Sequence, residues 1–161
     1  MQNIPSTTTG LFVYGTLMAP EVLGGLVHRV PALRAVKLRG FHRWCVKDAT
    51  FPAILKAPAN DIRAQVHGLL LEDLTAKELR CLDYYEDEAY ERQRVCVECA
   101  ETGEQLAANA YVWPAALDQQ IAIGMEWHYD DWRRDTMASF VRDVVEPCGR
   151  AFEEQDRAVE D

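Results

Sequence analysis

A short apolar run near the N-terminus breaks at a glycine in a way that suits the binding of a small anion. The run is Leu-Phe-Val-Tyr-Gly-Thr-Leu at residues 11–17, and Pro20, which favours the first turn of a helix, follows shortly after. A strand that leads into Gly15 and then into a helix places the N–H groups of a turn at the strand end, where they can hold a negative charge. Such junctions are common, so the loop alone predicts only a tight turn.

A second segment, at residues 82–92, is rich in acidic and tyrosine side chains. It reads Leu-Asp-Tyr-Tyr-Glu-Asp-Glu-Ala-Tyr-Glu-Arg and follows a predicted helix, which places Glu86 at or just past the helix end. Taken by itself, this segment is typical of a solvated acidic helix end. Its interpretation changes when the loop at residues 11–17 is considered with it.

The two segments, in this order, resemble the gamma-glutamylcyclotransferase superfamily, and most closely its AIG2-like branch. The resemblance extends from about Leu11 to Trp113, and a less specific likeness continues from Trp127 to Phe140. Three shorter motifs support it: Gly-Phe-His-Arg at 40–43, Phe-Pro-Ala-Ile at 51–54 and Val-His-Gly at 66–68.

The resemblance implies that a γ-glutamyl compound loses its amine or amino acid while the glutamyl part cyclises to 5-oxoproline. The substrate's own α-amino group is the nucleophile, so no metal, cofactor or protein nucleophile is implied. One carboxylate can take the proton from the attacking nitrogen and return it to the leaving nitrogen. The resemblance assigns this catalytic role to Glu86. Its acidic neighbours Asp83, Asp87 and Glu88, or burial, are expected to raise its pKa toward the working pH of a general base.

The same resemblance makes the first loop the substrate-binding segment. Its backbone N–H groups would hold the α-carboxylate of the γ-glutamyl group or the developing oxyanion, and Gly15 would allow the close approach. The side chains of Tyr14 and Leu17 are explained equally well as core residues beside a turn. The expected binding residues are Tyr14, Gly15, Thr16, Leu17 and Met18.

Three further residues receive a structural interpretation. Tyr90 is expected to be a half-buried strand tyrosine, and Arg92 a cation that pairs with neighbouring acids. Tyr111 can line the cavity, but core packing is the favoured interpretation.

The sequence departs from the family at one position, because many members have glycine after the catalytic glutamate and this chain has Asp87. The extra charge is expected to disfavour substrates with two carboxylates. The leaving group stays open among glutathione, γ-glutamyl amino acids, isopeptides and other γ-glutamylamines. A rival hypothesis also stays open, namely a non-catalytic small-molecule binding or regulatory protein that retains the pocket.

Composition limits the surroundings and partners of the protein. A chain of 161 residues suits one domain, and a net charge of −9 opposes binding to nucleic acid or to an anionic membrane. We find neither an apolar run of membrane-spanning length nor the features of a signal peptide. An odd number of irregularly spaced cysteines favours reduced thiols. We therefore expect a cytoplasmic protein with a small γ-glutamyl substrate, and its oligomeric state is not predicted.

A metal site is not expected either. Cys96 and Cys99 have the C-x-x-C spacing, but residues three apart on a strand point to opposite faces. The four histidines are scattered along the chain and provide no partner pair for a zinc site.

The pattern of apolar residues predicts an α+β fold, which the family resemblance sharpens to a small mixed β-barrel-like sheet with flanking helices. A capping-box spacing between Thr75 and Glu78 predicts a helix start, and Pro147 is expected to end a helix that begins near Met137. The Trp127–Trp132 segment is expected to dock the last helix on the barrel, with Asp130 or Asp131 as its cap. Residues 117–129 are left unassigned.

We expect strands at 32–38, 41–46, 63–71, 90–99 and 106–113. We also expect a flexible N-terminus at 1–9, one domain at 10–149 and a loose acidic tail at 150–161.

Overall fold

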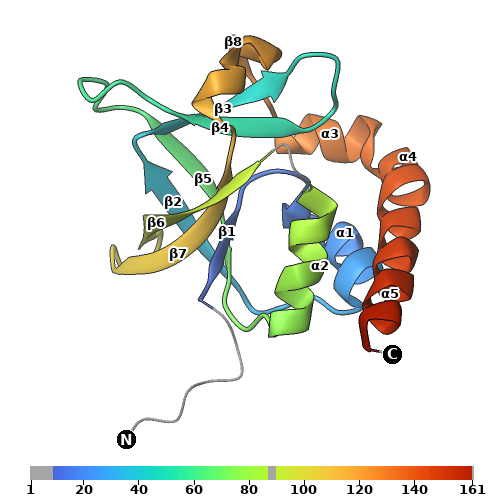
Figure 1. Ribbon diagram of the computed structural model, residues 1–161. Coiled ribbons are helices and arrows are strands. Elements are labelled where there is room, and N and C mark those ends of the chain that lie inside the picture. The colour runs from blue at the N-terminus through green and yellow to red at the C-terminus, as the bar shows by residue number, and fades with distance from the viewer. Residues whose placement is uncertain (1–8, 87–89, 161) are drawn as a thin grey trace, which may run out of the picture.

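A closed five-stranded barrel lies at the centre of the computed structural model, which describes residues 9–86 and 90–160 (Figure 1). The strand order around the barrel is β1-β5-β2-β6-β7. β1 pairs in parallel with β7, whereas the other neighbours are antiparallel, so the barrel is mixed as expected. The strands are β1 (Leu11–Val13), β2 (Leu33–Arg39), β5 (Gln65–Leu71), β6 (Glu91–Cys99) and β7 (Gln105–Val112).

A second, three-stranded sheet lies beside the barrel, in the order β4-β3-β8. β3 (Phe41–Val46) follows β2 after a turn at Gly40, whose φ of 86° suits glycine. β4 (Pro52–Lys56) pairs with β3 along its whole length. β8 (Ile121–Glu126) falls in the segment that sequence left unassigned, and its register on β3 shifts between Trp44 and Cys45. An irregular strand of this kind does not show the simple alternation that identifies strands in a sequence.

The helices gather on one side of the barrel (Figure 1). α1 and α5 pack against each other, and α2 contacts both. A large apolar cluster between these helices and the barrel includes Leu23, Leu82 and Phe152. The helices are α1 (Pro20–Val27), α2 (Ala76–Glu86), α3 (Tyr129–Asp135), α4 (Met137–Phe140) and α5 (Glu146–Glu160), with 3₁₀ turns at Thr16–Met18 and Ala115–Gln120.

The expected helix end at Pro147 is wrong, because the chain continues as α5 to residue 160. Pro147 is the second residue of α5 and follows a π-helical turn at Val141–Val145. The backbone stays helical from α4 through this turn into α5, and the Glu146 N–H donates to the carbonyl of Val141. The π-helical turn thus changes the regular hydrogen-bond pattern directly before Pro147, which has no N–H group to donate. The segment from residue 150, expected to be loose, is therefore helical up to residue 160, and Phe152 within it is buried. The predicted domain boundary at residue 149 falls inside this helix.

The expected cap of α3 is also wrong. His128 occupies the N-cap position and forms no side-chain capping bond, while Asp130 and Asp131 lie in the first turn. Negative side chains in a first turn still interact favourably with the helix dipole. Trp132 of this helix is buried and contacts the ring of Phe140, so the aromatic segment does dock the C-terminal helices.

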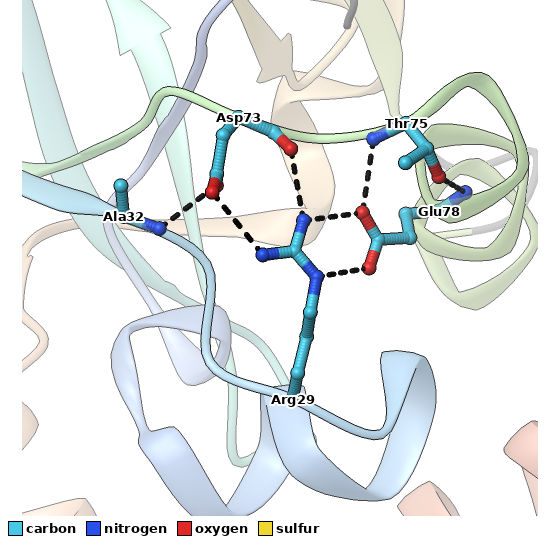
Figure 2. A network of polar contacts seen from close by, with 5 residues as sticks. All are labelled: Arg29, Ala32, Asp73, Thr75 and Glu78. Atoms are coloured by element: carbon cyan, nitrogen blue, oxygen red, sulfur yellow. Dashed lines mark hydrogen bonds and ion pairs between the residues drawn. The ribbon is translucent and has the colours of Figure 1, made fainter.

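A polar network fixes the start of α2 against the end of α1 and the start of β2 (Figure 2). Arg29 donates to both carboxylate oxygens of Glu78, each at 2.7 Å, and to the carboxylate and carbonyl of Asp73 at 3.2 and 2.8 Å. The other Asp73 oxygen accepts the N–H of Ala32. Thr75 and Glu78 exchange N–H bonds of 2.9 and 3.1 Å, which confirms the predicted capping box. The network thereby sets the direction of the helix that ends at Glu86.

Replacing Arg29 with alanine is expected to lower the free energy of unfolding by about 1–2 kcal/mol, because two bidentate contacts and their coupling to the helix cap are lost. Arg134→Ala is the matched control and should change stability much less, since among the described residues Arg134 pairs with the exposed Asp131 and Asp135 of its own helix. Arg29 is the main cause that lowers the pKa of Glu78, whereas the N–H group of Ala32 and then Arg29 lower that of Asp73, so the effect of Arg29 should fade in acid as these carboxylates become protonated. Urea denaturation of both variants measures the difference; equal losses would contradict a special role for the network.

Candidate active site

A cavity of about 500 Å³ opens where the loop after β1, the end of α2 and the connection between β3 and β4 meet. Its size suits a small molecule rather than a macromolecule. Residues from four parts of the chain line it: Phe12 to Leu17, Asp48 to Pro52, the tyrosines and glutamate at Tyr85, Glu86, Tyr90 and Tyr111, and Phe140 with Val144 from the C-terminal helices.

The loop after β1 presents backbone N–H groups at one wall of this cavity. Met18 and Ala19 donate their N–H groups to the carbonyls of Gly15 and Thr16, at 3.0 and 3.1 Å, which closes a short 3₁₀ turn. The first N–H groups of such a turn have no acceptor within it, so those of Thr16 and Leu17 can bind a ligand. A side chain at Gly15 would collide with Pro52, because a Cβ atom there would lie 2.8 Å from Cγ of that ring. Only glycine fits at position 15, because the Pro52 ring lies too close to allow a side chain there.

Four of the five predicted binding residues, Tyr14, Gly15, Thr16 and Leu17, line the cavity together with Glu86. Met18 does not line it and instead packs against the large apolar cluster between the barrel and the helices. The turn directs the Met18 side chain into the core. The functional roles of these residues stay a prediction, but the fold does bring the two sequence motifs to one place.

Glu86 is the last residue of α2, as the sequence predicts, and it is a half-buried residue that lines the cavity. Burial, with a smaller contribution from the carboxylate of Asp83, raises its pKa to about 8. A glutamate with this pKa exchanges protons readily near neutral pH, which is the property of a general acid or base. Asp87 and Glu88, which were also expected to raise this pKa, lie outside the described residues, as does the departure from the family at Asp87.

Hydrogen-bonded tyrosines line the cavity together with Glu86. The Tyr14 hydroxyl donates to the carbonyl of Tyr111 at 2.5 Å, and the Tyr90 hydroxyl donates to that of Pro52 at 2.7 Å. Thr16 Oγ1 and the Tyr85 hydroxyl are 2.7 Å apart. Burial raises the pKa of Tyr14, Tyr85 and Tyr90, so these phenols are neutral and hold fixed positions.

Tyr111 is buried in the core, which confirms the favoured interpretation, and it also lines the cavity. Its hydroxyl donates to one oxygen of Asp83 at 2.7 Å, while Arg92 donates to the other at 2.7 Å. The expected pairing of Arg92 with a neighbouring acid is thereby confirmed. Tyr90 is half-buried as expected and also lines the cavity.

Sequence reasoning missed the two outer walls of the cavity. One is the segment from Asp48 to Pro52, for which the Phe-Pro-Ala-Ile motif gave a partial signal. The other consists of Phe140 and Val144, whose apolar spacing predicted a core-facing helix and carried no sign of a ligand.

Replacing Asp83 with asparagine is expected to lower the pKa of Glu86 from about 8 by roughly half a unit to one unit, because a neighbouring negative charge is removed while burial remains. Carboxyl-carbon NMR of Glu86 during a pH titration measures this without any activity assay. Asp135→Asn is the control, because Asp135 is an exposed carboxylate of α3 that pairs with Arg134, and it should leave the titration unchanged. An unchanged pKa in Asp83→Asn would show that burial alone is responsible.

The described residues include no group of three or more His, Cys, Asp or Glu side chains arranged to hold a metal ion. All five cysteines fall within this part of the chain and are free thiols, and Cys96 is exposed whereas Cys99 is buried, as expected for opposite faces of β6. No helix among the described residues is both long and apolar enough to span a membrane.

The fold and the site define a class of small α+β proteins in which a mixed barrel carries a glycine loop and a buried acid at one cavity. Residues 11–134 match the family described as gamma-glutamyl cyclotransferase, AIG2-like. AIG2-like protein C of Arabidopsis thaliana is 39% identical over 131 residues, which are 81% of this chain and 73% of the relative. The chain therefore belongs to the AIG2-like branch of the gamma-glutamylcyclotransferase superfamily.

Solved structures agree with this assignment. A solution structure of an Arabidopsis thaliana protein matches with a TM-score of 0.66 and 25% identity, covering 98% of this chain and 88% of that chain. A structure described as a gamma-glutamyl cyclotransferase matches with a TM-score of 0.51 and 18% identity over 66% of each chain. At this identity the second likeness concerns the fold alone.

Proposed function

We propose that the protein is a cyclotransferase that converts a γ-glutamyl amide into 5-oxoproline and a free amine, with Glu86 as the proton-transfer residue. The observation that carries this proposal is the position of Glu86, with its pKa of about 8, in the same cavity as the loop after β1. The α-ammonium group of the substrate is a weaker acid than an ordinary carboxylic acid, so the raised pKa of Glu86 brings the two groups closer and makes proton transfer between them easier.

The reaction moves two protons from the attacking nitrogen to the departing one. The Glu86 carboxylate removes the first proton from the α-ammonium group, and the freed amine attacks the γ-carbonyl carbon, which closes a five-membered ring. In the tetrahedral intermediate the carbonyl oxygen is an oxyanion and the attacking nitrogen carries a positive charge. Protonated Glu86 gives its proton to the departing nitrogen as the C–N bond breaks, and the restored carboxylate then passes the second proton from the ring nitrogen to the released amine. The substrate's α-ammonium group is thus replaced by a neutral lactam and an ammonium product, so atoms and charge balance without water or any other reactant.

The loop after β1 would supply the remaining electrostatic stabilisation. Backbone N–H groups of Thr16 and Leu17 are suited to hold the α-carboxylate or the oxyanion, because their positions are set by the 3₁₀ turn before substrate arrives. The phenols of Tyr14, Tyr85 and Tyr90 are neutral and hydrogen-bonded. They would limit the water around the reacting atoms and keep the Glu86 carboxyl group ready for proton transfer.

The test is the formation of 5-oxoproline from a panel of γ-glutamyl amides that differ in the departing amine. Purified protein is expected to release 5-oxoproline and an equal amount of amine from at least one of them. Binding of these compounds, seen as thermal stabilisation, without any 5-oxoproline would contradict the proposal and favour the non-catalytic binding protein. The proposal includes a cytoplasmic location, supported by five free thiols.

A further inference from the structure

One outer wall of the cavity comes from a part of the chain that lies beyond the residues matching the family. The family match ends at residue 134, whereas Phe140 and Val144, which line the cavity, follow it in α4 and in the π-helical turn. Both belong to the C-terminal segment, residues 137–160, which forms one continuous helical column beside α1 (Figure 1). The cavity is therefore completed by residues outside the sequence motifs that identify the family.

The π-helical turn directs two neighbouring valines to different surroundings. The Glu146 N–H donates to the carbonyl of Val141, five residues back, where an α-helix would use the residue four back. Val145 is fully buried, while Val144 is exposed and lines the cavity. Because the two residues are adjacent in one hydrogen-bonded turn, the packing of Val145 fixes the position of Val144.

Two glycines allow α1 and the C-terminal segment to approach closely. A Cβ atom at Gly149 of α5 would lie 2.5 Å from the carbonyl oxygen of Gly25 in α1, and one at Gly25 would lie 2.8 Å from Cγ1 of Val145. Val145 thus occupies space that any side chain at position 25 would need. A Cβ atom at the preceding Gly24 would meet no heavy atom of the described residues within 4 Å. Gly25, and not Gly24, therefore sets how closely the π-helical turn packs on α1.

An aromatic cluster connects this wall to the one opposite. The Phe140 ring packs edge-on against Trp132 with 5.6 Å between ring centres, and the Trp132 ring lies 6.0 Å from that of Trp127. The Trp127 indole N–H donates to the carbonyl of Thr50 at 2.9 Å, and Thr50 lines the cavity. Both tryptophans are buried, so the two outer walls are joined through the core.

We infer that Phe140 and Val144 are specificity-determining residues that contact the departing group of the substrate, and that Gly25 is a positioning residue that acts on them through Val145. Under the proposed cyclotransferase function, on which this inference rests, the loop after β1 and Glu86 hold the γ-glutamyl end. The departing group then extends toward the outer walls, one of which is the apolar surface of Phe140 and Val144. The C-terminal segment thereby senses the size and shape of that group.

Two uncharged substrates that differ in size test the contact. γ-Glutamyl-methylamide has a minimal departing group, whereas γ-glutamyl-benzylamide adds a ring that can pack on an apolar wall. Val144→Ala is expected to lower the ratio of kcat/KM for the benzylamide to that for the methylamide by about three- to tenfold, because apolar contact with the ring is lost. Val159→Ala is the matched control, since Val159 is an exposed valine of α5 that does not line the cavity.

Gly25→Ala tests the positioning role from outside the cavity, which Gly25 does not line. The new methyl group displaces Val145 and the π-helical turn, so the same ratio should change by about threefold or more in a variant that is still folded. Gly24→Ala brings the same gain in helix propensity without the clash and should keep the ratio of the wild type. Should Gly25→Ala not fold, Val145→Ala, which empties the same contact, takes its place and should also change the ratio.

The outcomes separate the inference from the proposed function. If the wild type forms 5-oxoproline from neither compound, the proposed function is overturned and the inference falls with it. If the wild type is active but Val144→Ala changes the ratio no more than Val159→Ala does, the contact with the departing group is overturned while the cyclotransferase function stands. If Gly25→Ala, or Val145→Ala in its place, changes the ratio no more than Gly24→Ala does, the positioning role is overturned.

Discussion

Replacing Glu86 with glutamine is expected to reduce kcat/KM for 5-oxoproline formation by about 10²–10⁴-fold, the usual contribution of a positioned acid or base. Glutamine keeps the size and hydrogen-bonding capacity of the side chain but cannot accept the proton from the α-ammonium group. Glu91→Gln is the matched control, because Glu91 is an exposed glutamate in the same sequence motif and should tolerate the change. Steady-state kinetics with a γ-glutamyl amide that the wild type converts measures both variants.

The same substitution is expected to stabilise the fold at alkaline pH, which separates a functional role of Glu86 from a structural one. Burial raises its pKa from the ordinary 4.5 to about 8, so the folded state retains a proton that the unfolded state releases between these values. Stability therefore falls as pH rises through this range and levels off above about pH 8. Glutamine has no such proton to lose. The free energy of unfolding of the variant should therefore exceed that of the wild type by an amount that grows with pH to the order of a few kcal/mol.

Thermal unfolding at pH 4 and at pH 9 tests the linkage. The melting temperatures of wild type and Glu86→Gln should be nearly equal at pH 4, and the variant should melt higher at pH 9. Glu91→Gln should follow the wild type at both values. A variant that is inactive but also less stable at pH 9 would indicate that Glu86 supports the fold rather than the reaction.

The parts of this fold that sequence predicted well are those with local physical causes. The capping box of Thr75 and Glu78 is a contact over three residues, and the hairpin of β6 and β7 has a glycine with a φ of 74° at its turn. Barrel closure has no local cause, because it depends on three residues of β1 that pair with strands about sixty and a hundred positions away. Only the family resemblance anticipated it.

The C-terminal wall of the cavity shows why helical periodicity was insufficient. Phe140, Val141, Val144 and Val145 have the spacing of one α-helical face, and the pattern predicted that all would face the core. The π-helical turn at Val141–Val145 changes the angular step between residues, so Val145 is fully buried while Val144 is 43% exposed and lines the cavity. A pattern that assumes a regular helix cannot predict which valine reaches the ligand.

Replacing Gly68 with alanine is expected to lower the free energy of unfolding by about 3 kcal/mol or more, because backbone atoms occupy the space of the new methyl group. Gly68 lies in β5, and a Cβ atom there would come within 2.3 Å of the Val13 carbonyl oxygen and 2.8 Å of Phe12 Cε1. Neither group can rotate away, since Phe12 fills the barrel and Val13 is paired with Leu69 of β5.

Relief of this clash requires β1 to shift, and β1 carries the loop that runs from Tyr14 to Leu17 into the cavity. The variant should therefore lose affinity for γ-glutamyl amides at temperatures where it is still folded. Gly24→Ala is the control, because nothing lies within 4 Å of a Cβ atom at that position in α1, and alanine there should stabilise the helix by about 0.5–1 kcal/mol. In urea denaturation the free energy of unfolding should thus fall for Gly68→Ala and rise for Gly24→Ala. A Gly68→Ala variant as stable as the wild type would show that β1 and β5 can separate without cost. The rigid attachment of the loop to the barrel would then have to be abandoned.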